Sequence, residues 1–177
     1  MLEKRQSARQ KRHYLFEKDV SWSLPDLERY PQSVFGAQRK HDIHTGVDIF
    51  VPDGTKVFPI KAGKVIRVEW FTGSQSTPPT PWWNDTQAVW VQSDYFNTVY
   101  LYGEIKATVQ VGQWVTCTTE LGTISQVLKK EKGMTPTSML HFEMYSQAPE
   151  ESAIWKLDEA RPEFLLDPTE VLRGIVP

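Results

Sequence analysis

The chain has 177 residues, of which 40% are hydrophobic and 24% are charged, a composition typical of one globular domain with a sizeable core. Twenty basic and twenty-two acidic residues leave a formal net charge of −2. No overall field therefore attracts the protein to nucleic acid or to an anionic membrane, and nucleic acid is not expected as a partner. No apolar run approaches the length of a membrane span.

Residues 1–30 are predicted to form an N-terminal extension, partly disordered or packed on the domain that follows at 31–177. Its first residues carry a run of basic side chains: Lys4, Arg5, Arg9, Lys11 and Arg12. No apolar stretch of secretory length follows, so this segment does not have the form of a signal peptide. Cys117 is the only cysteine, which excludes an intrachain disulfide. Both observations predict a cytoplasmic location.

The first segment with candidate functional residues is HTGVDIF, which contains His44 and Asp48. Positions four apart in an extended strand lie on the same side, so these two side chains are expected to point the same way. Further along, several segments are rich in valine, isoleucine and aromatic residues and end at turn residues: 64–70, 88–93, 98–102 and 121–127. They predict short β-strands.

A long interruption, FTGSQSTPPTPWWNDT at 71–86, separates two of these predicted strands and holds Trp82 and Trp83 side by side. Connections of this length are usually functional or disordered. Two interpretations stay open. The tryptophans line a groove and contact a peptide or a sugar, or the loop lies on the surface with its aromatic rings folded back onto the body.

Near the C-terminus, SMLHFEMY alternates Leu140, Phe142 and Met144 with His141 and Glu143. This pattern predicts a strand that buries the first set and leaves the histidine face free. Helices are expected only as short elements around 150–159 and 168–172, where Pro162 and Pro168 limit extension. The elements together predict a mainly β fold, an antiparallel barrel or sandwich with short peripheral helices.

Two imidazoles and one carboxylate, from His44, His141 and Asp48, suit zinc with one coordination position left open to water. Spacing alone leaves a second interpretation, in which these are unrelated surface or turn residues. Resemblance favours the first. HTGVDIFVPDGTKVFPIKAGKV, NTVYLYGEIKATVQVGQWVTCTTELGTISQ and SMLHFEMY together resemble the lysostaphin-type, LytM-like zinc metalloendopeptidases, whose signatures are H-x-x-x-D and a late H-x-H. The similarity runs from about residue 34 to residue 172.

The resemblance implies that His44, Asp48 and His141 bind zinc in a barrel-sandwich hybrid of the duplicated hybrid motif type. PIKAGKVIRV and LGTI also resemble lipoyl and biotinyl carrier domains over a shorter stretch. This second resemblance is interpreted as a barrel-sandwich core motif that both families share. The resemblance also implies two auxiliary catalytic histidines, which are replaced here by Met139 and Tyr102. A thioether cannot carry a proton near neutral pH, and a phenol with a pKa of about 10 is a poor base.

Three other residues near the expected site are candidates for a replacement base: Glu143, Glu104 and His41. Glu143 shares the predicted face of His141 and is equally suited to orienting that ligand. If the protein hydrolyses peptides, Tyr102 is expected to stabilise the oxyanion in place of a histidine, with Met139, Trp82 and Trp83 as candidate contacts to substrate.

Three functional classes follow. The first is a zinc peptidase, weak or altered, acting on peptidoglycan-type or glycine-rich peptides. The second is an inactive pseudo-peptidase that keeps zinc and binds peptides or a protein partner. The third is a barrel with a vestigial site, whose surface, including the Trp82 loop, docks another protein. The family resemblance favours work outside the membrane and so conflicts with the predicted cytoplasmic location.

Overall fold

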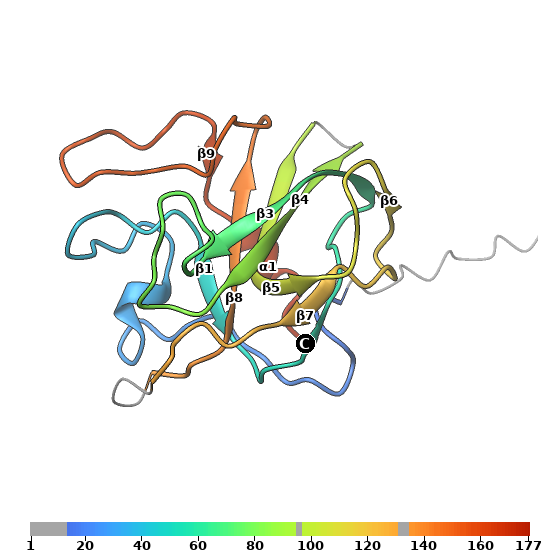
Figure 1. The fold of residues 1–177 in the computed structure, drawn as a ribbon, viewed down its shortest axis with the longest axis horizontal. Helices are drawn as coiled ribbons and strands as arrows, with labels where there is room; N and C mark the ends of the chain where they lie inside the picture. Colours follow the sequence, from blue (N-terminus) through green and yellow to red (C-terminus); the bar gives the residue numbers. More distant parts are fainter. Residues whose placement is uncertain (1–13, 95–96, 131–134) are drawn as a thin grey trace, which may run out of the picture.

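The computed structural model describes residues 14–94, 97–130 and 135–177, in which short strands dominate and helix is nearly absent (Figure 1). The strands are β1 (Val47–Phe50), β2 (Lys56–Val57), β3 (Gly63–Thr72), β4 (Thr86–Ser93), β5 (Val99–Ala107), β6 (Trp114–Val115), β7 (Gly122–Ile124), β8 (Met139–Tyr145) and β9 (Leu165–Leu166). The helical elements are η1 (Pro31–Ser33), a single 3-10 turn, and α1 (Thr169–Arg173).

The strands join in one antiparallel sheet with the order β1-β8-β5-β4-β3-β6. Strand β7 pairs with both β2 and β5, and β9 pairs with the far end of β8. Because β8 lies between β1 and β5, residues from three strands that are distant in sequence become direct neighbours around it. The candidate zinc ligands lie in this part of the sheet.

The two faces of β5 and β8 pack into different apolar clusters. Leu140, Phe142 and Tyr102 lie in the larger cluster, with Val57, Val65 and Leu172 among its other members. Leu101 and Tyr145 lie in the smaller one, where the Tyr145 ring stacks on Trp90 at 5.2 Å between centroids. Both strands are therefore buried on both faces, which explains why nearly all their side chains are inaccessible.

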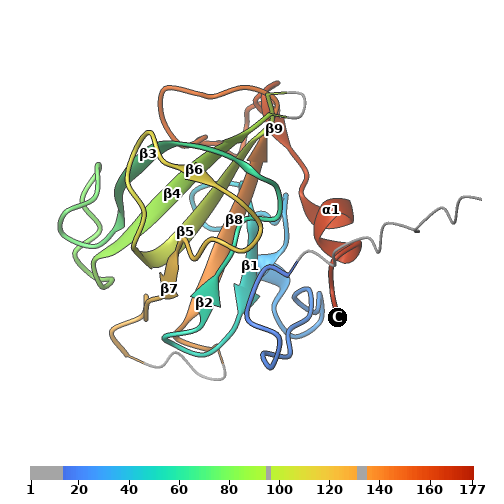
Figure 2. The ribbon, with the colours of Figure 1, turned by 90° about the vertical axis from the view of Figure 1, so that its right-hand side faces the viewer.

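The N-terminal segment contributes directly to the larger cluster. Leu15 and Phe16 are fully buried there, and Trp22 packs edge-on against Phe16 at 5.5 Å between ring centroids. A single β-bridge joins Phe16 to Val57. Figure 2 shows this segment and α1 on the same side of the sheet. The basic run at residues 4–12 lies outside the described residues.

The predicted strands at 64–70, 88–93 and 98–102 are confirmed as parts of β3, β4 and β5, and 121–127 contains the shorter β7. The prediction of a helix at 150–159 is wrong: the segment has turns and a β-bridge at Trp155 instead, because its backbone pairs with Ile43. Helix α1 begins directly after Pro168, as expected for a residue without an N–H to donate. In the part of the chain that is described, no helix combines the length and apolar character needed to cross a membrane.

Candidate metal centre

Three side chains far apart in sequence converge at the junction of β1 and β8. Asp48 and His141 are direct cross-strand partners, and His44 lies just before β1 on the approach to it. All three residues are buried, and a potential ligand atom of each lies within 4.8 Å of the other two. The chain passes so close to His141 at Gly46 that a Cβ there would lie 2.9 Å from the imidazole, so only glycine fits.

Two of the three distances between the donor atoms match those of a tetrahedral zinc site, and the third is shorter by about 0.5 Å. Nε2 of His44 lies 3.3 Å from Nδ1 of His141 and 3.2 Å from Oδ1 of Asp48, and the remaining pair is 2.8 Å apart. Zinc bonds of about 2.0–2.1 Å at tetrahedral angles place ligand atoms roughly 3.3 Å from one another. Two imidazole nitrogens and a carboxylate oxygen are also ligand types that zinc accepts.

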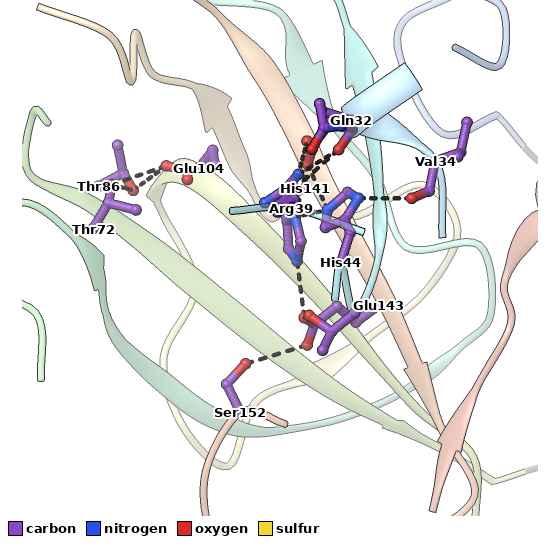
Figure 3. Close-up of polar contacts among 12 residues, drawn as sticks. Gln32, Val34, Arg39, His44, Thr72, Thr86, Glu104, His141, Glu143 and Ser152 are labelled. Carbon is purple, nitrogen blue, oxygen red and sulfur yellow. Dashed lines mark hydrogen bonds and ion pairs between the residues drawn. The ribbon is translucent and has the colours of Figure 1, made fainter. Parts of the chain in front are cut away.

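The other nitrogen of each histidine has a hydrogen-bond acceptor of its own. His44 Nδ1 donates to the carbonyl oxygen of Val34 at 2.9 Å, and His141 Nε2 donates to Oε1 of Glu143 at 2.9 Å (Figure 3). These bonds place a proton on each outer nitrogen, so Nε2 of His44 and Nδ1 of His141, which face Asp48, are the nitrogens that can bind a metal once they are deprotonated. Such partners are the usual means by which proteins orient metal-binding histidines.

Arg39 holds the Asp48 carboxylate through the oxygen that does not face the histidines. Its Nη2 donates to Oδ2 of Asp48 at 2.8 Å, while the same guanidinium also donates to the carbonyl oxygen of Gln32. Burial opposes the charge on Asp48, but the neighbouring imidazoles of His44 and His141 outweigh it and hold the pKa of this carboxyl below its usual range. Asp48 is therefore an ionised carboxylate whose Oδ1 faces the two imidazoles.

Glu143 is the centre of a second buried network behind His141. Thr45 Oγ1 donates to its Oε1 at 2.5 Å, and the Tyr145 hydroxyl and Ser152 Oγ donate to its Oε2. Burial opposes its charge too, yet the hydrogen bond with His141 leads the effects that lower the pKa of Glu143. Since Ser152 belongs to the segment after β8, this network ties a wall of the cleft to a zinc ligand.

The three candidate ligands lie at the bottom of an open cleft of about 680 Å³. Trp83, Leu128, Met139, Ile154 and Trp155 are among the apolar residues that line it. Phe71 and Glu104 line the wall beside His141. A cleft of this volume, lined by both aromatic and charged side chains, has room for a peptide segment beside the metal centre.

Tyr102 does not reach this cleft, which corrects the expectation that it stabilises an oxyanion there. Its side chain is fully buried in the larger apolar cluster, and its hydroxyl accepts a hydrogen bond from the backbone N–H of Ile60 at 3.0 Å. The β5 residue that lies opposite His141 is Gly103, one position further along. Strand alternation turns Tyr102 to the other face of the sheet.

The remaining candidate residues differ in where they lie. Met139 lines the cleft on the same strand face as His141, and Trp83 lines it from the long loop. Trp82 is 63% exposed and contacts Trp83 edge-on at 6.1 Å between ring centroids, outside the cleft lining. His41 is exposed at the rim of the cleft. Of the two interpretations of the long loop, the groove-lining one therefore describes Trp83, whereas Trp82 lies on the surface.

The family model for peptidase family M23 matches residues 42–152, which include all three candidate ligands and more than half of the chain. The chain belongs to peptidase family M23. No curated protein sequence matches it closely enough to serve as a relative. The mainly β fold predicted from the sequence is also that of the M23 structures it resembles.

Three solved structures are similar in fold to this member of the family. Lysostaphin from Staphylococcus simulans is 16% identical with a TM-score of 0.54, and the match covers 88% of this chain and 50% of that one. A catalytic domain of a prophage-encoded M23 protein from Enterococcus faecalis is 17% identical with a TM-score of 0.50, covering 84% and 96%. A zinc-containing peptidase from Vibrio cholerae is 18% identical with a TM-score of 0.50, covering 84% and 39%. The chain thus spans about half of full-length lysostaphin.

Several residues of this M23 site were not predicted from the sequence. Arg39 and Thr45 flank His44 closely in sequence, so their proximity to the ligands is the one signal that was available. Gly103, Phe71 and Ser152 reach the site only through strand pairing and loop packing. No local pattern distinguishes them from ordinary strand or loop residues.

Proposed function

We propose that this protein is a zinc-dependent peptidase that hydrolyses peptide bonds in peptidoglycan-type or glycine-rich peptides. The observation that carries the proposal is the convergence of three buried donor groups at one point of an open cleft. Each outer nitrogen is held by an acceptor, so that Nε2 of His44, Nδ1 of His141 and Oδ1 of Asp48 are all left to bind one ion. Three protein ligands in an open cleft, rather than four in a closed site, are typical of catalytic zinc.

We assign separate roles in metal binding, ligand orientation and substrate contact to the residues of the cleft. His44, Asp48 and His141 would hold the zinc ion, with Arg39 and Glu143 keeping two of these ligands in orientation. Zinc bound there would polarise a substrate carbonyl and lower the pKa of a water molecule to about 7. Trp83 and Trp155, which line the same cleft as His141, would contact the peptide on either side of its scissile bond.

A second function, peptide binding without hydrolysis, is favoured by one observation. Met139 lines the cleft on the strand face of His141, Gly103 lies opposite His141 across the β5–β8 pair, and neither side chain can carry a proton. A positioned acid or base typically contributes roughly 10²- to 10⁴-fold to a rate. Slow turnover is therefore expected unless another group in the cleft exchanges protons.

The test is incubation of the zinc-loaded protein with oligoglycine and with peptidoglycan fragments, followed by mass spectrometry and counting of new amino termini. We expect cleavage by the wild-type protein and none by His44→Ala, which removes one ligand. His41→Ala is the matched control for zinc content, because that histidine lies at the rim and binds none of the three ligands. Saturable peptide binding without any product would favour the second function and contradict the first.

A further inference from the structure

The wall of the cleft next to His141 is closed where a proton carrier would be expected. Gly103 lies directly opposite His141 across the β5–β8 pair. The space above Gly103 is filled by Phe71, since a Cβ at that position would lie 2.7 Å from the ring. The same ring lies against the His141 imidazole at 5.3 Å between centroids. Any proton-exchanging group must therefore come from another position.

A bulge in β5 brings in the next residue, Glu104. Two β4 steps, from Gln87 to Val89, pair with three β5 steps, from Ile105 back to Tyr102, so β5 contains one extra residue at this point. Glu104 has a φ of 64°, a left-handed conformation that is unfavourable for a non-glycine residue. Strict alternation would place it on the same face as Tyr102, but it lines the cleft instead. Bulges of this kind commonly redirect a side chain next to an active site.

The Glu104 carboxylate is buried and held on one oxygen only. Thr72 Oγ1 and Thr86 Oγ1 both donate to Oε2, at 3.0 and 2.6 Å (Figure 3). Among the described residues, no donor bonds Oε1 and no cation forms an ion pair with this group. Oε1 is therefore available to a molecule in the cleft, while the threonines keep the side chain in one orientation.

Glu104 is also set to exchange a proton near neutral pH. Burial is the main cause that raises its pKa to about 7, partly offset by the hydrogen bond from Thr86. The charged groups that act on it are His141, which favours the carboxylate, and Asp48, which opposes it. A base of this strength is near the optimum for catalysis at pH 7, where it is both available and able to return the proton.

We propose that Glu104 is the proton-transfer residue of this cleft, an inference that rests on the peptidase function proposed above. A water molecule gives one proton to Oε1 of Glu104 while its oxygen bonds to the carbonyl carbon of the scissile peptide. When the carbon–nitrogen bond breaks, the departing nitrogen takes that proton from Glu104. The carboxylate is regenerated, and the products are a carboxylic acid and an amine.

The decisive variant is Glu104→Gln, which preserves the shape and still accepts the threonine hydrogen bonds but cannot take up the proton. We expect it to bind one zinc ion as the wild type does, to lose roughly 10²- to 10⁴-fold in kcat, and to keep its KM within about threefold. The acid limb in the pH dependence of kcat, present in the wild type, should be absent in Glu104→Gln. In Thr86→Val, which removes a donor to the carboxylate, that limb should move to higher pH.

A readout independent of turnover uses carbon-13 NMR of labelled glutamate carboxyls, with the Glu104 signal assigned by its absence in Glu104→Gln. Adding zinc should lower the titration midpoint of Glu104 in the wild type but not in His44→Ala. An unchanged midpoint, or full turnover by zinc-loaded Glu104→Gln, would overturn this inference and leave the peptidase proposal intact. A zinc-loaded wild type that binds peptides and cleaves none would overturn both.

Discussion

At the scale of single residues, Glu104 is buried in an environment that disfavours its ionised form. Burial is the main reason that its pKa is raised from 4.5 to about 7. A raised pKa in the folded state means that stability is complete below the unfolded value and is lost as the pH rises through about 7. The side chain also requires a left-handed backbone. Such costs are expected where a group serves function rather than folding.

The metal-free protein should therefore respond to Glu104→Gln in a pH-dependent way. At pH 4 to 5 both side chains are neutral, and the free energy of unfolding should be nearly the same. At pH 8 the variant should be more stable by up to about 3 kcal/mol, since the pKa shift of about 2.5 corresponds to about 1.36 kcal/mol per unit. Urea denaturation at the two pH values measures this difference. An effect of equal size at both values would contradict the assigned burial of the charge.

Glu143 is predicted to control zinc affinity through His141. Glu143→Gln replaces the carboxylate that accepts the Nε2 proton, and loss of such a partner typically weakens metal binding about 10- to 100-fold. Competition with a chromophoric chelator measures the affinity. Glu159→Gln is the matched control, because Glu159 is exposed and paired only with Lys156 among the described ion pairs. Equal zinc affinity in the two variants would exclude the orienting role.

At the scale of elements, the strands could be predicted from local patterns but the bulge could not. Runs of β-branched and aromatic residues are sufficient to locate β3, β4 and β5, and the alternation of Leu140 with His141 predicts the free histidine face. The bulge depends on how β5 pairs with β4, which no local pattern encodes. The family resemblance placed Tyr102 in the site, whereas the bulge brings Glu104 into the cleft.

The hydroxyl of Tyr102 is predicted to stabilise the fold rather than the reaction. Tyr102→Phe leaves the buried N–H of Ile60 without its acceptor, which should cost about 1–3 kcal/mol in the free energy of unfolding. Zinc affinity should stay unchanged, because the ring lies on the other face of the sheet from His141. Parallel urea denaturation and zinc titration test both statements. Weaker zinc binding at unchanged stability would place Tyr102 in the site after all.

At the scale of the whole molecule, the site depends on contacts between distant parts of the chain. Arg39 donates a hydrogen bond to Asp48 on β1. In the segment after β8, Ser152 donates to Glu143 and Trp155 pairs with Ile43. The ligand set could be found from its spacing and its resemblance to a family. Its supporting contacts could not, because each depends on the three-dimensional path of a loop.

The N-terminal segment is predicted to be part of the folding unit. Phe16→Ala should destabilise the protein by about 3–5 kcal/mol, since the ring is fully buried between Trp22 and the larger cluster. Leu27→Ala, at a side chain that is 68% exposed, should change stability by less than about 0.5 kcal/mol. Chemical denaturation of the two variants provides the comparison. A similar, small effect in both would show that residues 14–24 are dispensable for the core.

The most direct measurement of the central claim is zinc K-edge X-ray absorption on the purified, zinc-loaded protein. We expect about one zinc ion per chain, with a first shell of about four nitrogen and oxygen atoms at about 2.0–2.1 Å and the outer-shell signature of two imidazoles. That result is required if His44, Asp48 and His141 bind one ion together. A shell containing sulfur at about 2.3 Å, a spectrum without imidazole scattering, or failure to retain zinc would contradict it.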